Sequence, residues 1–375
     1  MVDSLDVDVV IAGGGPVGHA LALALSESPL DVVHIPGSRD TADRPIALSY
    51  GSRLILEHLG VWQGVTNTPI ATIHVSQRNG FGRVLMRASE HGLPALGYVT
   101  SYRELLAALA GRTGSTPGAL ASWEAKEERV GLRVDREGKE TAFSARLLVL
   151  ADGGMERHPV RVKDYFQTAI VADVLPDRAH RGMAWERFTG EGPLALLPFG
   201  DRYAMVWSVR PATARELLDL SDSDFLTRLR QTFGARAGDF VSVGPRAAFP
   251  LSLRQGAPSP APRTLAIGNA AQPLHPVAGQ GLNLGLRDAW ELARMLLDTE
   301  RHQIGAKQFV DRYLRARRSD RFSGIGVTDF LVRIFSNSLP PLALARGAGL
   351  TLLDMLPPAR RFLARRMIFG TRALP

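Results

Sequence analysis

Two glycine-rich stretches carry the residue types and spacings that could do chemistry. In the second stretch, His275 and Pro276 precede Gly279-Gln280-Gly281, and an apolar helical stripe begins at Leu282. Bare backbone at a helix N-terminus offers unpaired N–H groups and the positive end of the helix dipole. A phosphate or another flat, partly negative group would fit there. The alternative is an ordinary Gly-rich connection between a strand and a helix.

The first stretch gives a more specific pattern. Gly13, Gly15 and Gly18 form G-x-G-x-x-G, with Pro16 and Val17 before the third glycine, between an apolar run at 7–12 and an apolar helix. In this pattern the first glycine allows a tight turn, the second lets a pyrophosphate approach, and the third lets helix and strand pack closely. The context predicts a dinucleotide site.

One expected residue is missing from that site. An Asp or Glu normally closes the second strand and holds the adenosine ribose, but Pro36 follows the predicted strand at 32–35. The nearby acids Asp31 and Asp40 stand at the wrong positions. We therefore expect weaker dinucleotide affinity than usual, with the adenosine half held by backbone and by Ser38 or Arg39.

Three further positions could serve a phosphate-bearing ligand. Arg44 could reach the pyrophosphate or form a surface ion pair, and Arg103, at a helix start, could bind phosphate or be a helix-face charge. Asp152-Gly153 ends a buried strand at 147–150, a position where Asp-Gly is commonly just a turn.

The elements that position these residues predict a mixed fold. Parallel strands and helices surround the glycine motifs. Four strands (167–175, 182–189, 194–199 and 202–210), one helix near 214–233 and one strand near 240–249 follow residue 160. Residues 203, 205, 207 and 209 alternate as in a half-buried antiparallel strand. Trp185, Phe199 and Trp207 on these strands could line a substrate pocket or pack in the core.

This reading gives an α/β class, α+β overall. A discontinuous Rossmann-like dinucleotide-binding domain (1–70, 95–160 and 262–300) is interrupted by a mostly antiparallel β-sheet substrate domain (71–94 and 161–261), and a basic helical region (301–375) follows.

Composition excludes several classes of protein. The chain has no cysteine, so disulfides, thiolate catalysis and Cys-bound metal are excluded. No apolar run of about 18 residues predicts a membrane-spanning helix, and the acidic N-terminus is not typical of a signal peptide. We find no H-E-x-x-H metal site, no G-x-S-x-G nucleophile elbow and no second G-x-G-x-x-G.

Charge is concentrated at the C-terminal end. Residues 301–375 hold fourteen Lys or Arg and four Asp or Glu, a net charge of +10, whereas the whole chain carries +8. A basic, partly apolar segment suits an anionic lipid surface. A solvated helical face is one alternative and nucleic acid another, although no nucleic-acid motif is recognisable.

Together the motifs resemble the FAD-dependent aromatic hydroxylases, which share the p-hydroxybenzoate hydroxylase fold. The matching motifs are the glycine pattern from Gly13, Asp152-Gly153, and Gly268-Asn269 with His275-Pro276 and Gly279–Gly281. Segments 44–48, 182–189, 192–198, 328–335 and 358–360 are most similar to the ubiquinone-biosynthesis hydroxylases, and within them to the 2-octaprenyl-6-methoxyphenol hydroxylases. That branch also has Asn where most of the superfamily has Asp after Gly268.

The resemblance implies a FAD enzyme that uses NAD(P)H and O2 through a flavin C4a-hydroperoxide to hydroxylate a polyprenylated phenol. It implies catalytic-site positions at His275, Pro276 and Gln280, although His275 could simply shape the loop. It implies that NAD(P)H visits the flavin only transiently. The implied FAD contacts are Gly13, Gly15, Pro16, Val17, Gly18, Arg44, Arg103, Asp152, Gly153, Gly268, Asn269, Pro276, Gly279, Gln280, Gly281, Leu282 and Asn283.

A polyprenyl tail is too apolar to meet in water, so we expect a cytoplasmic protein bound peripherally to the inner membrane through its basic C-terminal region. Other ubiquinone-biosynthesis proteins could instead bind that region. Two alternatives stay open: a flavoenzyme for a small phenol or an isoprenoid, and a degenerate non-catalytic scaffold or lipid carrier.

Overall fold

Four apolar strand segments form the parallel centre of the first sheet. The computed structural model describes residues 6–37, 42–153, 161–255, 257–271, 280–320 and 340–370. β1 (Asp6–Ala12) lies between β2 (Val32–Ile35) and the last part of β10 (Lys139–Leu150), and β17 (Thr264–Ala266) pairs with β10 on its other side, all in parallel. Strands covered on both faces read as unbroken Val, Ile and Leu, and the strands predicted here are confirmed.

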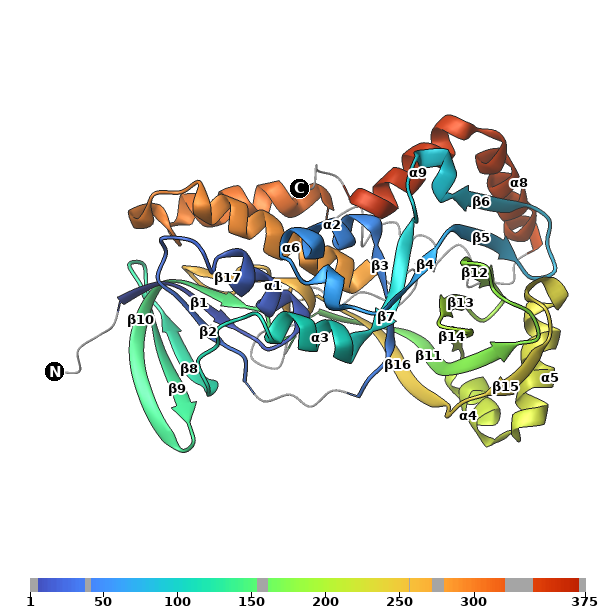
Figure 1. Ribbon diagram of the computed structural model, residues 1–375, viewed down its shortest axis with the longest axis horizontal. Helices are drawn as coiled ribbons and strands as arrows, with labels where there is room; N and C mark the ends of the chain where they lie inside the picture. Colours follow the sequence, from blue (N-terminus) through green and yellow to red (C-terminus); the bar gives the residue numbers. More distant parts are fainter. Residues whose placement is uncertain are drawn as a thin grey trace.

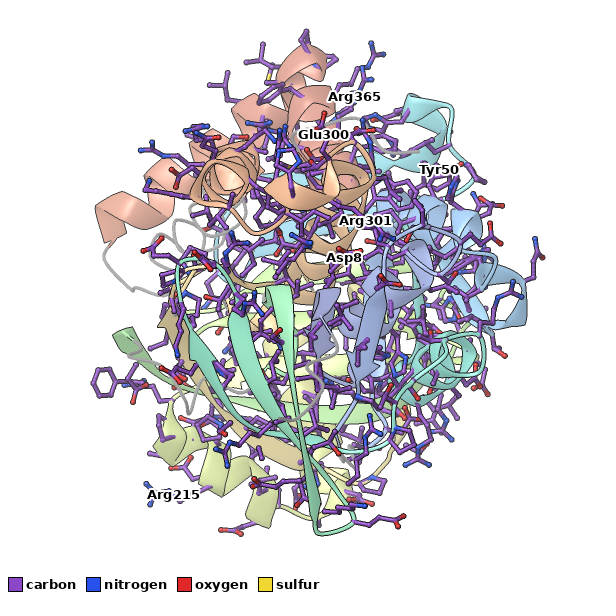
Figure 2. The ribbon with its side chains drawn as sticks, turned by 90° about the vertical axis from the view of Figure 1, so that its left-hand side faces the viewer. Asp8, Tyr50, Arg215, Glu300, Arg301 and Arg365 are labelled. Atoms are coloured by element: carbon purple, nitrogen blue, oxygen red, sulfur yellow. The ribbon has the colours of Figure 1, made fainter. Side chains whose placement is uncertain are left out.

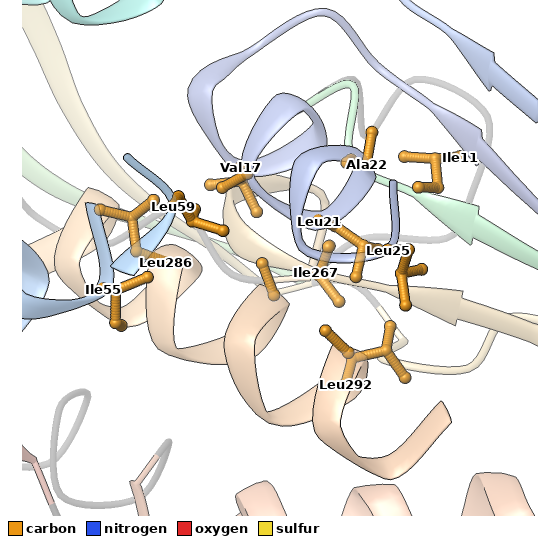
Figure 3. Close-up of a cluster of buried hydrophobic side chains, with 14 of the residues drawn as sticks. Ile11, Val17, Leu21, Ala22, Leu25, Ile55, Leu59, Ile267, Leu286 and Leu292 are labelled. Atoms are coloured by element: carbon orange, nitrogen blue, oxygen red, sulfur yellow. The ribbon is translucent and has the colours of Figure 1, made fainter. Parts of the chain in front are cut away.

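The remaining strands of this sheet form an antiparallel extension. The first part of β10 pairs with β9 (Val130–Arg136), which pairs with β8 (Ala119–Ala125). Three helices belong to this half of the molecule: α1 (Pro16–Ala24), α3 (Tyr102–Ala110) and α6 (Gln280–Leu297). Figure 3 shows the core that they help to form, with Val17 and Leu21 of α1 near Ile267 and Leu286.

A small antiparallel sheet stands between the two large ones (Figure 1). It consists of β3 (Pro45–Ser49), β7 (Gly97–Ser101) and β4 (Asn67–Ile70), in that order. Ser49 ends β3 and caps α2 (Tyr50–His58), accepting a hydrogen bond from the Ser52 N–H at 3.2 Å. Short 3-10 turns lie at Trp62–Gly64, Ala88–His91, Ala235–Ala237, Gly268–Ala270 and Arg301–Gln303.

The second large sheet has the order β15-β11-β14-β13-β12-β5-β6, with β16 also paired to β11. Its pairs are antiparallel except for β12 and β5, which run parallel. The strands are β5 (Thr72–Gln77), β6 (Arg83–Arg87), β11 (Arg161–Pro176), β12 (Met183–Phe188), β13 (Pro193–Phe199), β14 (Arg202–Val209), β15 (Phe240–Val243) and β16 (Ala247–Gln255).

Three details differ from the sequence predictions. The single helix expected at 214–233 is two, α4 (Pro211–Asp219) and α5 (Asp222–Phe233), because Leu220 is extended and Ser221 caps a new helix. The strand expected at 240–249 is split into β15 and β16 by Gly244-Pro245, since proline has no N–H for the ladder. β14 is not half-buried: Ala204 and Ser208 are buried as fully as Tyr203 and Met205.

The C-terminal part is helical, as predicted. Residues 307–320 form one helix, and α8 (Pro340–Met355) and α9 (Pro357–Phe369) follow. Leu350 of α8 and Ile368 of α9 pack with Val84 and Met86 of β6 and with Phe188 of β12. These helices therefore lie against the same end of the second sheet as the β5–β6 hairpin (Figure 1).

Ion pairs fasten the segment after α6 to the first sheet. Asp8 of β1 pairs with Arg301 at 3.4 Å and with Arg146 of β10 at 3.2 Å, and Figure 2 shows Asp8 and Arg301 next to each other. No described helix combines the length and the apolar character that crossing a bilayer requires.

Candidate cofactor site

The three motif segments meet at one edge of the first sheet. The register aligns Ala12 of β1 with Leu150 of β10, and Leu150 with Ala266 of β17, so the three strands end at the same level. The glycine motif, Asp152-Gly153 and Gly268-Asn269 begin just beyond these ends. Ligands of open α/β sheets bind at the carboxyl ends of the strands, and the structure brings the start of all three predicted motifs to this edge.

Gly13 and Gly18 of the first motif have the backbone geometry that their positions predicted. A Cβ on Gly13 would lie 2.3 Å from the carbonyl carbon of Ala151, and Gly13 has a φ of +142°, so only glycine fits the turn. A Cβ on Gly18 would lie 2.1 Å from the Gly13 carbonyl oxygen, which shows how closely α1 and β1 approach.

Gly15 is different, because it faces open space. The nearest atom to a Cβ there would be the Tyr102 hydroxyl oxygen at 3.9 Å. Gly15 precedes α1, and no described side chain caps this helix and no acid lies in its first turn. The α1 N-terminus with its open approach fits the pyrophosphate of a dinucleotide, so the residues present are compatible with FAD.

Pro36 lies against the glycine motif rather than presenting an acid. A Cβ on Gly14 would be 2.6 Å from the Pro36 carbonyl oxygen. Asp31 begins the strand instead of ending it, and its carboxylate pairs with Arg301 at 3.6 Å. Ser38, Arg39 and Asp40 lie outside the described residues. That backbone and Ser38 or Arg39 hold the adenosine half therefore stays a prediction.

Tyr102 stands between Arg44 and the glycine motif. Its guanidinium stacks over the Tyr102 ring at 4.2 Å, and the hydroxyl of that ring is the atom nearest the open side of Gly15. The stacking holds an exposed cation against the tyrosine that borders the open side of Gly15, and the contact of Arg44 with a pyrophosphate stays a prediction.

Arg103 is placed by Asp43, a residue that the sequence analysis missed. Asp43 Oδ1 accepts hydrogen bonds from the N–H groups of Arg103 (3.0 Å) and Arg44 (2.9 Å) and from the Ser101 hydroxyl (2.8 Å). Partial burial raises the pKa of Asp43, but these hydrogen bonds outweigh burial and lower it overall. Because both N–H groups belong to the main chain, Asp43 fixes the backbone at the two predicted arginines. An exposed Asp before Arg-Pro gives no sequence pattern for this role.

The second loop approaches α1 closely. A Cβ on Gly285 of α6 would lie 2.7 Å from Val17 Cγ2 and 3.1 Å from the Gly268 Cα, so these two glycines and Val17 set the distance between α1 and α6. Asn269 is exposed at this edge, and a Cβ on Gly281 would lie 3.7 Å from its Oδ1.

Asn283 differs from its predicted role. Its Oδ1 accepts hydrogen bonds from the Ser49 N–H and the Ser52 hydroxyl, both at 2.7 Å, and its Nδ2 donates to the Ala47 carbonyl at 3.0 Å. The buried amide joins α6 to β3 and α2, because it satisfies main-chain groups there. It acts as a structural tie rather than as a direct cofactor contact.

Several predicted residues of the second loop cannot be placed. His275, Pro276 and Gly279 lie outside the described residues, and only the backbone of Gln280, at the start of α6, is described. Leu282 is half-buried in the first turn of α6.

The predicted substrate-pocket residues do not come together. Trp207 and Trp185 pack with Phe225 and Phe233 of α5 on one face of the second sheet, and Trp185 Nε1 donates to the Tyr203 hydroxyl at 3.1 Å. Phe199 lies on the opposite face, with Ile70 and Val99. The core-packing alternative therefore holds for the two tryptophans, because a strand directs alternate side chains to opposite faces.

Two histidines under the glycine motif were also missed. The rings of His19 (α1) and His34 (β2) meet edge to face at 4.7 Å, and His34 Nε2 contacts the Gly13 carbonyl oxygen at 3.0 Å. Burial lowers the pKa of His19 to about 4, and His34 lowers it further. Both rings are therefore neutral near pH 7.

Comparison with known proteins agrees with this geometry. Residues 6–321 match a family described as FAD binding domain. The ubiquinone hydroxylase UbiL of Rhodospirillum rubrum is 35% identical, over 98% of this chain and 90% of its own. The 3-demethoxyubiquinol 3-hydroxylase of Escherichia coli is 30% identical, over 92% and 93%.

A solved structure supports the fold. That of p-nitrophenol 4-monooxygenase PnpA from Pseudomonas putida superposes with a TM-score of 0.74 over 98% of this chain and 100% of that one, at 16% identity. Such low identity bears on the fold alone. On the matched family and the two relatives, the chain belongs to the FAD-dependent hydroxylases of ubiquinone biosynthesis.

Proposed function

We propose that this enzyme hydroxylates a polyprenylated phenol, with NAD(P)H as the reductant and O2 as the oxygen source, at the cytoplasmic face of the inner membrane. The observation that carries the proposal is the open cradle at Gly15 in a chain whose relatives are named ubiquinone hydroxylases. The substrates of those relatives carry over only as a class: an electron-rich phenol with an apolar tail.

The residues of the chain bind and orient the cofactor. The α1 N-terminus and Arg44 would hold the pyrophosphate, and Asn269 would hydrogen-bond the ribityl chain. Bound FAD would accept a hydride from NAD(P)H and deliver one oxygen atom to the ring. In the same proposal, residues 1–70, 95–160 and 262–300 form the FAD-binding domain and residues 71–94 and 161–261 the substrate domain.

An apolar, basic surface on the C-terminal helices supports membrane contact. Leu352, Met355, Leu356 and Phe362 are 57%, 72%, 45% and 66% exposed, and Arg361 and Arg365 are exposed beside them. We call these six residues the α8–α9 platform. Exposed apolar side chains among arginines suit the headgroup region of an anionic bilayer.

The first test is the visible spectrum of the purified protein before and after adding FAD. Flavin absorbance near ~450 nm that NAD(P)H bleaches, faster with a 2-polyprenylphenol in vesicles, and a product heavier by one oxygen atom are the expected results. A colourless protein that ignores FAD would contradict the proposal, as would hydroxylation of water-soluble phenols with no effect of vesicles.

A further inference from the structure

Glu186 places a carboxyl group on the face of the second sheet that is turned away from α5. Trp185 and Arg187 of β12 point toward α5 and Ser76, as the Trp185–Phe233 ring contact and the Arg187–Ser76 hydrogen bond show. Glu186, between them, must point to the other face. Its Oε1 is buried and has no hydrogen-bond partner among the residues that the structure describes.

The residues level with Glu186 form an apolar row across the sheet. The register places Val75 of β5 on one side and Ala195 of β13 on the other, followed by Val206 of β14 and Val171 of β11. Each of these side chains is only partly buried, although the strands lie in the middle of the sheet. We call Val75, Glu186, Ala195, Val206 and Val171 the acid row. It is an apolar strip with one acid.

The acid row faces the cofactor side of the molecule. Ala184, next but one to Glu186, packs with Val99 of β7, and β7 pairs with Ala47 of β3, which receives the Asn283 amide of α6. Asp173 lies farther along the same face. Burial raises the pKa of its carboxyl group, the charge of Arg202 lowers it, and the charge of Asp43 also raises it. Asp43 fixes Arg44, so this face and the pyrophosphate region lie within electrostatic range.

The other end of the face meets the C-terminal helices. Phe188, next but one to Glu186 in the opposite direction, packs with Ala364 and Ile368 of α9. The acid row therefore lies between the helices of the α8–α9 platform and the cofactor region.

No described cation compensates the Glu186 carboxylate. The strands beside it, β5 and β13, present only uncharged side chains to this face. Arg187 points away, and Arg360 of α9 is paired with Glu90 at 3.2 Å and with Asp354 at 3.2 Å. Burial alone raises the pKa of Glu186 to about 7. A buried carboxylate oxygen without a hydrogen-bond partner costs stability, and the described residues supply none to Glu186 Oε1, so this position suits a ligand that donates a hydrogen bond.

We propose that Glu186 binds the hydroxyl of the phenolic substrate and accepts its proton, while the apolar residues of the acid row hold the ring and the start of its tail. This inference rests on the proposed function and adds a catalytic residue to it.

The proton balance closes within the hydroxylation. The phenol O–H bond breaks, the proton moves to a Glu186 oxygen, and the electron pair makes the ring carbon more nucleophilic toward oxygen. One oxygen atom of O2 enters the ring and the other leaves as water, with two electrons from NAD(P)H. The attacked carbon then loses its hydrogen as a proton, which goes to the departing oxygen that leaves as water. As the ring becomes aromatic again, Glu186 returns its proton to the same phenol oxygen.

The test compares Glu186→Gln, Glu186→Asp and a matched control, Glu216→Gln. Glu216 is exposed on α4, beyond the opposite face of the sheet. FAD content and the rate at which NAD(P)H reduces the flavin should be unchanged in all three variants. With a 2-polyprenylphenol in vesicles, kcat for hydroxylation should fall by about 10²-fold or more in Glu186→Gln, with hydrogen peroxide released instead. Glu186→Asp should recover part of the loss.

Two further readouts separate catalysis from structure. In the wild type, kcat/KM should rise with pH through about 7, the value for Glu186, and that limb should disappear in Glu186→Gln. Ultraviolet difference spectra should show the bound phenol as phenolate in the wild type and as neutral phenol in Glu186→Gln.

The outcomes also distinguish this inference from the proposed function. Hydroxylation by Glu186→Gln with the wild-type rate and pH profile would overturn the role of Glu186 and leave the function intact. A wild type that ionises the bound phenol through Glu186 but hydroxylates no prenylated phenol would overturn the function and keep the site. A wild type that neither ionises the bound phenol nor hydroxylates a prenylated phenol would overturn both the role of Glu186 and the proposed function.

Discussion

Asp288 of α6 accepts a hydrogen bond from the main-chain N–H of Gly268 at 3.2 Å, so the helix that follows the second glycine-rich loop also fixes the residue where that loop begins. The same carboxylate pairs with Arg317 at 2.7 Å. Arg317 pairs in turn with Asp320 at 2.7 Å, and Arg287 with Asp320 at 2.9 Å. All four charges are buried, and together they join α6, the helix at 307–320 and the cofactor edge.

Removing the central carboxylate should be costly. Asp288→Ala leaves the buried Arg317 with one acid in place of two and frees the Gly268 N–H, so we expect the free energy of unfolding to fall by about 3–5 kcal/mol. Urea unfolding followed by circular dichroism measures the change. Asp298→Ala, an exposed position at the end of α6, should stay within about 0.5 kcal/mol. Equal effects of the two variants would show that the buried cluster contributes nothing.

Two glycines of the first motif should respond differently to alanine. In Gly15→Ala the added methyl meets no protein atom closer than 3.9 Å, so the apoprotein should keep its stability while FAD affinity falls about tenfold, or 1.4 kcal/mol. In Gly18→Ala the methyl would lie 2.1 Å from a carbonyl oxygen, so stability should fall by about 1–3 kcal/mol as well.

Gly64 supplies the control for these variants, since a Cβ there meets nothing within 4 Å. FAD affinity from fluorescence titration and thermal unfolding of the apoprotein provide the two readouts. If Gly15→Ala bound FAD like the wild type, the placement of the pyrophosphate at Gly15 would be wrong.

Acid should destabilise the protein in two separate ranges of pH. Burial lowers the pKa of His19 and of His74 to about 4, from 6.5 in the unfolded chain. Between pH 6.5 and 4 the unfolded chain therefore binds more protons than the folded chain. The contribution of these two histidines to stability is fully present above pH 6.5 and is lost as the pH falls toward 4. Arg287 and Arg317 outweigh burial and lower the pKa of Asp320 below 3.8, so its contribution is lost only at still lower pH.

His19→Leu tests the upper range, because leucine suits the buried site and cannot titrate. The thermal midpoint of this variant should decline less than that of the wild type between pH 6.5 and 4.5, while His302→Gln, at an exposed site, should follow the wild type. Parallel curves for His19→Leu and the wild type would mean that His19 does not titrate in this range.

The α8–α9 platform should bind anionic vesicles through both its apolar and its charged residues. Serine at Leu352 and Phe362 removes two apolar contacts worth up to about 1.5–3 kcal/mol each, so vesicle affinity should fall at least tenfold. Serine at Arg361 and Arg365 should weaken binding mainly at low salt. Arg215→Ser is the control, since Figure 2 shows Arg215 and Arg365 at opposite ends of the molecule. Co-sedimentation measures binding, and a platform variant that binds like the control would place the contact elsewhere.

The cofactor edge could be predicted from the sequence because each of its motifs follows a buried parallel strand. Parallel strands of one sheet end at the same edge, so Gly13, Asp152 and Gly268 had to meet there once each strand was recognised. The glycine spacing added the roles of Gly13, Gly15 and Gly18, which depend on backbone approach and not on distant side chains.

The inner face of the second sheet could not be predicted in the same way. Alternation shows that Trp185 and Glu186 point in opposite directions, but it does not show which direction is the cofactor side. Covering helices decide this, and α5 covers the tryptophan face. Likewise, the sequence gives no reason to join Asp288 to Arg317 or Asp43 to Arg103, because both contacts depend on how separate elements pack.

The end of α9 covers the buried charge cluster behind the cofactor edge. Gly370, at the end of α9, lies so close to the buried charges that a Cβ there would be 2.7 Å from Arg287 Nε and 2.8 Å from Asp320 Oδ1. The buried charges behind the cofactor edge are therefore fully enclosed only when the chain up to Gly370 is folded, so α9 contributes to the cofactor site without touching it.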